Sequence, residues 1–397
     1  MNPRYELEFV EAIHSREPVG GLTHNFYRYP ARFSPLFARG AIKMLTEPGE
    51  LVLDPFMGGG TALVEARVLG RQAIGSDINP LSIFITQVKT TPLSASDIAQ
   101  IEAWGATLGP ELNLRNEAVR DWDWIRAGYQ RNIDGKSTWA IRKALELGLT
   151  AVAGLPEETQ RRFARCALLR TGQWALDCRS HIPSVSEFRL QLKVNLENMI
   201  ASAQEYAHAA ATAETYVAEG ESIRTVTLLQ SVVGIDRNET VRCAPAPALI
   251  LTSPPYPGVH VLYHRWQVQG RRETPAPYWI ANCLDGNFAS YYTFGDRQQQ
   301  NLMSYFQQLQ AGFESLARLA DARTVLVQMV AFSDPASQLP RYLEMLKQAG
   351  WFEVSYPTIS NGRDGRVWRE TPNRKWYADQ RGIIPASKEV VLFHRLP

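Results

Sequence analysis

The sequence lacks the features that mark several large classes of protein. It contains no apolar run close to the roughly 20 residues of a membrane span. Its first residues are charged and have no apolar core, so they do not resemble a secretory signal. The four cysteines stand far apart, without a CxxC pair for zinc and without the spacing of a disulfide framework. We therefore expect a cytoplasmic protein with no membrane partner and no bound metal.

Excess charge of one sign is also missing. The 42 lysines and arginines against 40 aspartates and glutamates give a net charge of +2. No global basic field points to nucleic acid, and any basic surface must be local. The hydrophobic fraction of 45% over 397 residues is ordinary for a globular protein with a substantial core. That length allows two or three domains, or one domain with a large insertion.

The segment 51–90 alternates between strand and helix patterns. A short apolar run ends at Asp54, a helical pattern follows from Thr61 to Gly70, and residues 72–77 have the pattern of a second strand. This order predicts a βαβ unit, hence a parallel sheet with a right-handed crossover.

The middle of the chain differs from both ends. Helical patterns at 157–174 and 185–218 dominate residues 91–222, where β-branched runs are few. Strand patterns return at 223–230, 248–252, 324–330, 351–356 and 389–394, with helical patterns at 302–320 and 337–349. We predict one α/β domain built from residues 1–90 and 223–397, with helices on both faces of its sheet. Residues 91–222 form a helical insertion in this interpretation.

A glycine-rich loop, Asp54 to Thr61, joins the first predicted strand to its helix. Glycines allow a sharp turn and a close approach to a ligand. A triphosphate would require a lysine after the glycines, and a dinucleotide would require GxGxxG; neither pattern is present. S-adenosylmethionine carries an ammonium and a sulfonium, and Asp54 suits such a cation. Asp77, at the tip of the second strand, lies about 20 residues further on, where an acid binds ribose hydroxyls. A purely structural turn is the alternative.

A second motif follows the strand pattern that ends at Thr252. Ser253-Pro254-Pro255-Tyr256 cannot continue a paired strand, because its two prolines donate no backbone hydrogen bonds. The tip is therefore stiff, with a polar residue, Ser253, at its start and an aromatic residue, Tyr256, at its end. An ordinary β-turn is the alternative, since Ser-Pro and Pro-Pro are common in turns.

These motifs together resemble the DNA amino-methyltransferases. DPFMGGGTALVEARVLGRQAIGSDINP is similar to their cofactor motif, HNFYRYPARFSPLFARGAIKMLTEPGELVLDPF to the segment before it, and TSPPY to their catalytic tetrapeptide. The resemblance covers about 24–90 and 223–260. It implies a Rossmann-like class I methyltransferase fold with S-adenosylmethionine as cofactor. The expected cofactor-binding residues are Tyr29, Phe33, Asp54, Pro55, Phe56, Gly58, Gly60, Thr61, Asp77, Ile78 and Asn79.

The serine form of the tetrapeptide resembles the subgroup that methylates the N4 amine of cytosine. Ser253 and the Pro254 carbonyl are expected to accept hydrogen bonds from that amine, Pro255 to fix the turn, and Tyr256 to stack on a flipped-out base. Adenine N6 methylation, an RNA methyltransferase and a catalytically silent DNA-binding subunit stay open as alternatives. Methylation of a ring carbon would require a thiolate after proline, and Cys243 stands instead in Arg-Cys-Ala-Pro.

Two stretches that mix basic and aromatic residues are the candidate DNA contacts. They begin at Tyr263 and Arg363, and lysine and arginine supply the salt-dependent attraction to phosphate. The implied partners are double-stranded DNA and, in a restriction-modification system, a cognate restriction endonuclease. The insertion 91–222 is a candidate region for target recognition. The basic residues expected at the DNA are Arg265, Arg271, Arg272, Arg366, Arg374 and Lys375.

Overall fold

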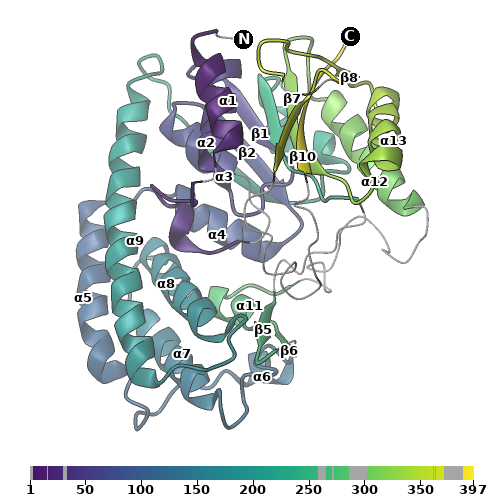
Figure 1. Cartoon of the computed structure of the whole chain (residues 1–397). Coiled ribbons are helices and arrows are strands. Elements are labelled where there is room, and N and C mark those ends of the chain that lie inside the picture. The colour runs from purple at the N-terminus through teal and green to yellow at the C-terminus, as the bar shows by residue number, and fades with distance from the viewer. Residues whose placement is uncertain are drawn as a thin grey trace.

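The structure is a computed structural model, and it describes residues 3–15, 17–29, 34–257, 265–270, 272–285, 302–360, 362, 364–370 and 388–397. Its main element is an eight-stranded sheet in the order β3-β2-β1-β4-β7-β10-β8, with β9 paired to β10 (Figure 1). β5 and β6 form a separate two-stranded sheet. The strands are β1 (Leu51–Asp54), β2 (Gln72–Asp77), β3 (Thr225–Leu229), β4 (Leu249–Thr252), β5 (Trp266–Val268), β6 (Arg272–Thr274), β7 (Val325–Ala331), β8 (Phe352–Glu353), β9 (Val367–Glu370) and β10 (Lys388–Arg395).

The strand order confirms the predicted Rossmann-like methyltransferase fold. β3, β2, β1, β4 and β7 run parallel, whereas β10 lies antiparallel to β7. The order reverses between β1 and β4, since the chain builds β2 and β3 on one side of β1 and β4 and β7 on the other. In open α/β sheets ligands bind beyond the carboxyl ends of the strands at such a switch point. The fold therefore directs attention to the ends of β1 and β4.

Local sequence signals explain where many helices begin. Asn79 caps α4 and Pro80 occupies its first turn, where a missing N–H costs nothing. Capping boxes start α5 at Ser94 and α9 at Ser184. The helices are η1 (Pro3–Tyr5), α1 (Glu6–His14), η2 (His24–Phe26), α2 (Pro35–Leu45), α3 (Thr61–Val68), α4 (Pro80–Thr90), α5 (Ala95–Glu111), α6 (Trp122–Arg126), α7 (Trp139–Val152), α8 (Glu158–Leu176), α9 (Val185–Glu214), η3 (Ile235–Arg237), α10 (Glu239–Arg242), α11 (Ala276–Ala281), α12 (Met303–Ala317) and α13 (Pro335–Gln348).

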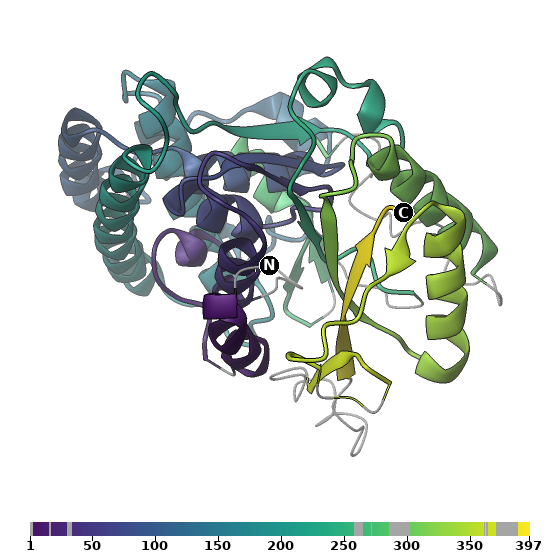
Figure 2. The same ribbon diagram turned by 90° about the horizontal axis from the view of Figure 1, so that it is seen from above.

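Helices cover both faces of the sheet, and each face has its own core. α1, α2 and α3 pack on one face, where Phe9, Phe37 and Leu63 meet Leu251 and Val327. α12 and α13 pack on the other face (Figure 2). Because both faces are covered, the central strands are buried along their whole length, as parallel strands usually are.

A helical lobe of α5 to α9 stands beside the sheet (Figure 1). Its core continues without a break into η2 and α4, and it also includes Trp266, Val268 and Tyr278 from the β5–α11 segment. Residues 265–285 thus pack with the helical lobe, although the sequence suggested that they belong with the sheet. Among the residues that the structure describes, no helix is both long and apolar enough to cross a membrane.

Candidate functional site

The glycine loop between β1 and α3 has the shape that its sequence predicts. Gly58 and Gly60 have φ angles of 47° and 72°, a region that side chains disfavour. A Cβ on Gly60 would lie 2.6 Å from Thr86 of α4, and one on Gly59 would lie 2.9 Å from Tyr29. The loop therefore needs glycine for its conformation and for its packing against α4 and Tyr29.

Tyr29 and Asn79 hold this loop from the side of the helical lobe. The Asn79 side-chain amide donates to the Tyr29 hydroxyl at 3.4 Å, and the Asn79 side-chain oxygen accepts from Tyr278 at 3.0 Å. That oxygen also caps α4 by accepting from the backbone of Leu81. Tyr278 of α11 thus ties the lobe to the tip of β2, a contact that no sequence pattern indicated.

Asp54 ends β1 beneath the loop and is 1% exposed. One carboxylate oxygen accepts from the Thr252 hydroxyl at 2.9 Å and from the Phe56 backbone. The other oxygen is buried and has no hydrogen-bond partner among the described residues. Burial raises the pKa of Asp54 to about 7, and the nearby charge of Asp77 adds to the effect. A buried carboxylate oxygen without a partner is the group that a cationic ligand would satisfy.

Asp77 ends the neighbouring strand β2. Its two oxygens accept from the backbone N–H groups of Gly58 and Asn79 at 3.0 and 2.9 Å. Burial raises the pKa of this carboxyl too. Ile78 follows with 37% of its surface exposed. Two acids and an exposed apolar side chain thus surround the loop, and these residues fit S-adenosylmethionine, which is cationic at one end and carries a ribose and adenine at the other.

The SPPY tip continues β4 into the same region. The Ser253 hydroxyl donates to the Met329 carbonyl at 3.0 Å, and this leaves its lone pairs to accept from another group. The Pro255 carbonyl accepts from Tyr305 at 2.7 Å. Within the part of the chain that is described, the Pro254 carbonyl accepts no hydrogen bond. Ser253 and Pro254 therefore have acceptor capacity to offer a ligand.

One hydrogen bond joins the tip to the glycine loop. Thr252, directly before Ser253, donates to Asp54, and the two residues lie 198 positions apart in the chain. β1 and β4 are neighbours in the sheet, with Val52 opposite Leu249 and Leu53 opposite Ile250. The structure therefore brings the two motifs together at the switch point.

Glu389 and Arg369 are site residues that the sequence reasoning missed. The Tyr256 hydroxyl donates to Glu389 of β10 at 2.9 Å, and Arg369 of β9 donates to the other oxygen of Glu389 at 2.8 Å. The strand at 389–394 was expected, but a glutamate at its start is typical of a solvent-facing edge. Only the antiparallel return of β10 beside β7 places it next to the tip.

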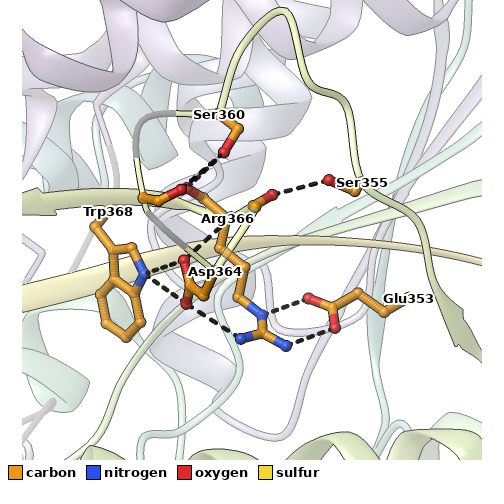
Figure 3. Close-up of polar contacts among 8 residues, drawn as sticks. Glu353, Ser355, Ser360, Asp364, Arg366 and Trp368 are labelled. Carbon is orange, nitrogen blue, oxygen red and sulfur yellow. Dashed lines mark hydrogen bonds and ion pairs between the residues drawn. The ribbon is translucent and has the colours of Figure 1, made fainter.

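The structure describes three of the arginines expected at DNA: two of them pair with carboxylates and the third is exposed. Arg265, which the sequence analysis expected at DNA, is buried and pairs with Asp285 at 3.1 Å. Arg366 donates to both oxygens of Glu353, at 2.6 and 2.8 Å, and also pairs with Asp364 (Figure 3). Its donors are therefore used to brace the turn before β9. Arg272 on β6 is exposed. Phe33, Arg271, Arg374 and Lys375 lie outside the described residues.

Comparison with known proteins finds matches to the segment that contains the glycine loop. Residues 11–87 match a DNA methylase family. The type II methyltransferase M.MvaI of Kocuria varians is 39% identical over 82 residues, which are 20% of this chain and 18% of that protein. M.MjaII of Methanocaldococcus jannaschii is 36% identical over 66 residues, 17% of this chain and 12% of that protein. The matches thus span less than a fifth of these relatives.

Similarity to solved structures is weaker. An rRNA methyltransferase, AviRa from Streptomyces viridochromogenes, covers 77% of this chain and 78% of its own, with 13% identity and a TM-score of 0.29. A score this low does not establish a shared fold, and the fold assignment rests on the strand order instead. The resemblance to the DNA amino-methyltransferases that the motifs indicated is confirmed by the family match and by the type II relatives.

Proposed function

We propose that this chain, which carries the cofactor segment of the DNA methylase family, is a site-specific DNA methyltransferase that acts on the N4 amine of cytosine. The observation that carries the proposal is the Thr252–Asp54 hydrogen bond, because it holds the SPPY tip beside the glycine loop. One motif accounts for a methyl donor and the other for a methyl acceptor, and they meet at the switch point of the sheet.

The residues of the loop are suited to S-adenosylmethionine, which supplies an activated methyl group on sulfur. Asp54 has a buried oxygen that can accept from its ammonium group, and the Asp77 carboxylate, beside the loop, can accept from its ribose hydroxyls. Ile78 offers an apolar surface to its adenine. Tyr29 and Asn79 keep the loop in place from the outside. The protein's contribution is orientation and electrostatics, as in other cofactor enzymes.

The SPPY residues act on the target amine. An exocyclic amine is a poor nucleophile, because its lone pair is delocalised into the ring. Ser253 and the Pro254 carbonyl can accept its two N–H groups and draw the nitrogen towards tetrahedral geometry. Tyr256 can stack on the ring of the flipped base, an interaction worth roughly 1–3 kcal/mol. The Ser253 side chain is a neutral hydroxyl and therefore a weak base, and we assign removal of the amine proton to water.

Ser253 favours methylation of cytosine N4. Methylation of adenine N6 is the second candidate function. The adenine type of this motif often has aspartate at the first position, and a neutral hydroxyl replaces that charge here. The type II methyltransferases that match the chain are consistent with either base.

The partner in this proposal is double-stranded DNA, with the base flipped out of the stack. Arg272, which is exposed on β6, is retained as a phosphate contact, together with Arg271, Arg374 and Lys375. The helical insertion 91–222 is proposed as the region of target recognition, joined by residues 265–285 because the two share a core. A cognate restriction endonuclease belongs to the proposal only as a consequence of the type II relatives.

Transfer of labelled methyl to DNA and to RNA, followed by digestion to nucleosides, tests this function. We expect label in N4-methylcytosine from duplex DNA. Label in N6-methyladenine would replace the first candidate by the second, and label in RNA alone would overturn both. Binding of cofactor and DNA without any transfer would indicate a silent subunit.

A further inference from the structure

A buried ion pair lies next to the SPPY tip. Glu389 and Arg369 face each other across the antiparallel pair β9–β10, and both are less than a tenth exposed. Arg369 donates to one oxygen of Glu389 through two nitrogens, at 2.7 and 2.8 Å. A buried ion pair adds little net stability, because removing both charges from water offsets their attraction. Its position is therefore better explained by what the glutamate contacts.

The second oxygen of Glu389 accepts the hydroxyl of Tyr256 at 2.9 Å. Arg369 thus holds the Glu389 carboxylate through one oxygen, and the other oxygen of the carboxylate holds the Tyr256 hydroxyl. Hydrogen bonds to a charged acceptor are the stronger kind. The Tyr256 hydroxyl also lies 3.3 Å from the Ser253 hydroxyl, so the contact reaches the residue expected to hold the amine.

We propose that Glu389, held by Arg369, is a positioning residue that fixes the ring of Tyr256 for the target base. The inference rests on the proposed function, in which Tyr256 stacks on that base. A tyrosine ring held only through its backbone can turn about its side-chain bonds. An anchored hydroxyl removes that freedom before the base arrives, and pre-organisation of this kind lowers the entropy cost of binding and orientation.

The backbone directly before Tyr256 is also held by a hydrogen bond. Tyr305 of α12 donates to the carbonyl of Pro255 at 2.7 Å. The tyrosine is therefore held at both ends, by a helix from one face of the sheet and by β10 within it. Neither contact touches the glycine loop, so the proposal predicts that base positioning and cofactor binding respond separately to substitution.

A double-mutant cycle between Tyr256 and Glu389 tests this role in the full-length chain. Glu389→Ala and Tyr256→Phe should each lower kcat/KM for duplex DNA about 10- to 100-fold and change the dissociation constant of S-adenosylmethionine less than twofold. The double variant should be no worse than the poorer single variant, because both changes remove the same Tyr256–Glu389 hydrogen bond and Glu389→Ala removes the ion pair with Arg369 in either background. Glu389→Gln keeps an acceptor for the tyrosine and should recover a large part of the activity.

Glu353→Ala is the matched control. Glu353 also forms a close ion pair with an arginine beside β10, but its partner is Arg366 and it does not contact Tyr256. We expect kcat/KM within about twofold of the wild-type value. Losses that multiply in the double variant, or a cofactor dissociation constant that rises as activity falls, would overturn the positioning role. If Glu389→Ala does not fold, Tyr256→Phe decides alone: kcat/KM for duplex DNA should fall about 10- to 100-fold with the cofactor dissociation constant within twofold, and an unchanged kcat/KM would overturn the role.

Failure of the proposed function would give a different pattern. If the wild-type chain transfers no methyl to DNA, the same cycle is measured on the midpoint of denaturant unfolding. Shifts of the two single variants that do not add in the double variant support the Tyr256–Glu389 contact independently of methylation. Additive shifts would overturn the contact itself.

Discussion

In the proposed cofactor site, the ionisation of Asp54 should control how tightly S-adenosylmethionine binds. Its pKa of about 7 is high because the carboxyl is buried, and a cation beside it would favour the ionised form. Affinity for S-adenosylmethionine should therefore fall as the pH drops below 7, approaching tenfold per pH unit. Calorimetric titration between pH 5.5 and 7.5 measures this dependence.

Asp54→Asn is the control for that dependence. Asparagine keeps an oxygen for Thr252 but cannot ionise, so its affinity should be weak and flat over the same pH range. In the cofactor-free chain at pH 8 the substitution should raise the free energy of unfolding, because the buried ionised carboxylate destabilises the fold above its normal pKa. A wild-type affinity that does not change with pH would contradict the role given to Asp54.

In the proposed function, Ser253 acts on the methyl acceptor and not on the cofactor. Ser253→Ala removes the expected acceptor of the amine together with the hydrogen bond to Met329. We expect kcat to fall at least about 100-fold, a loss typical of a transition-state hydrogen bond. The dissociation constant of S-adenosylmethionine should change little, and stability should drop by about 1 kcal/mol. Equal losses of cofactor affinity and activity would show that this division of roles is wrong.

At the scale of elements, the glycine loop depends on its fit against α4. Gly60→Ala places a methyl group 2.6 Å from Thr86 at a φ of 72°. Gly128 has a similar φ of 79°, and a Cβ there would meet no other atom within 4 Å. Gly128→Ala therefore measures the cost of the backbone conformation alone. We expect Gly128→Ala to lower the free energy of unfolding by about 1–2 kcal/mol, and Gly60→Ala to lower it by a further 1–3 kcal/mol or so. Denaturant unfolding measures both, and only Gly60→Ala should weaken cofactor binding.

The sequence predicted the elements better than their contacts. Strands expected at 72–77, 248–252, 324–330 and 389–394 are β2, β4, β7 and β10 within a residue or so, because each is an apolar run bounded by polar or turn residues. β5, β6 and β9 were missed, since they are short and lie among charged residues. The order of the strands and the antiparallel course of β10 depend on long-range packing, which no local pattern encodes.

The same limit applies to the side chains of the site. Asp54, Asp77 and Ser253 could be named because they follow apolar strand patterns in a recognisable order. Glu389 could not, because its partner Tyr256 lies beyond the end of β4 and 133 residues away in the chain. Arg265 and Arg366 were expected at DNA because they lie in basic stretches. The carboxylates that engage them, Asp285 and Glu353, lie 20 and 13 residues away, a separation at which the sequence alone does not reveal a pair.

For the whole molecule, the buried His394 makes stability depend on pH. It lies on β10 and is 1% exposed, and burial lowers its pKa to about 3. The unfolded chain binds a proton there below about pH 6.5, whereas the folded chain does not until about pH 3. Stability is therefore lost as the pH falls from 7, by about 2 kcal/mol at pH 5 from this group alone.

His394→Leu should make that loss shallower. His208→Gln, at an exposed position on α9, is the control for replacing a histidine. Urea unfolding at pH 5 and pH 7 compares the three proteins. An equal difference between the two pH values in the wild type and in His394→Leu would contradict the assignment.

The position of β10 between β7 and β8 has a consequence for how the protein is made. Asp54 leaves the ribosome early, Thr252 long after it, and Glu389 later still. Contacts between segments this distant form slowly, because a long loop must close before they contribute. A growing chain can complete the β1–β2 unit first, yet Tyr256 meets its carboxylate only when β10 has been synthesised and inserted. A partly synthesised chain can therefore hold the glycine loop before the contacts of the SPPY tip are complete.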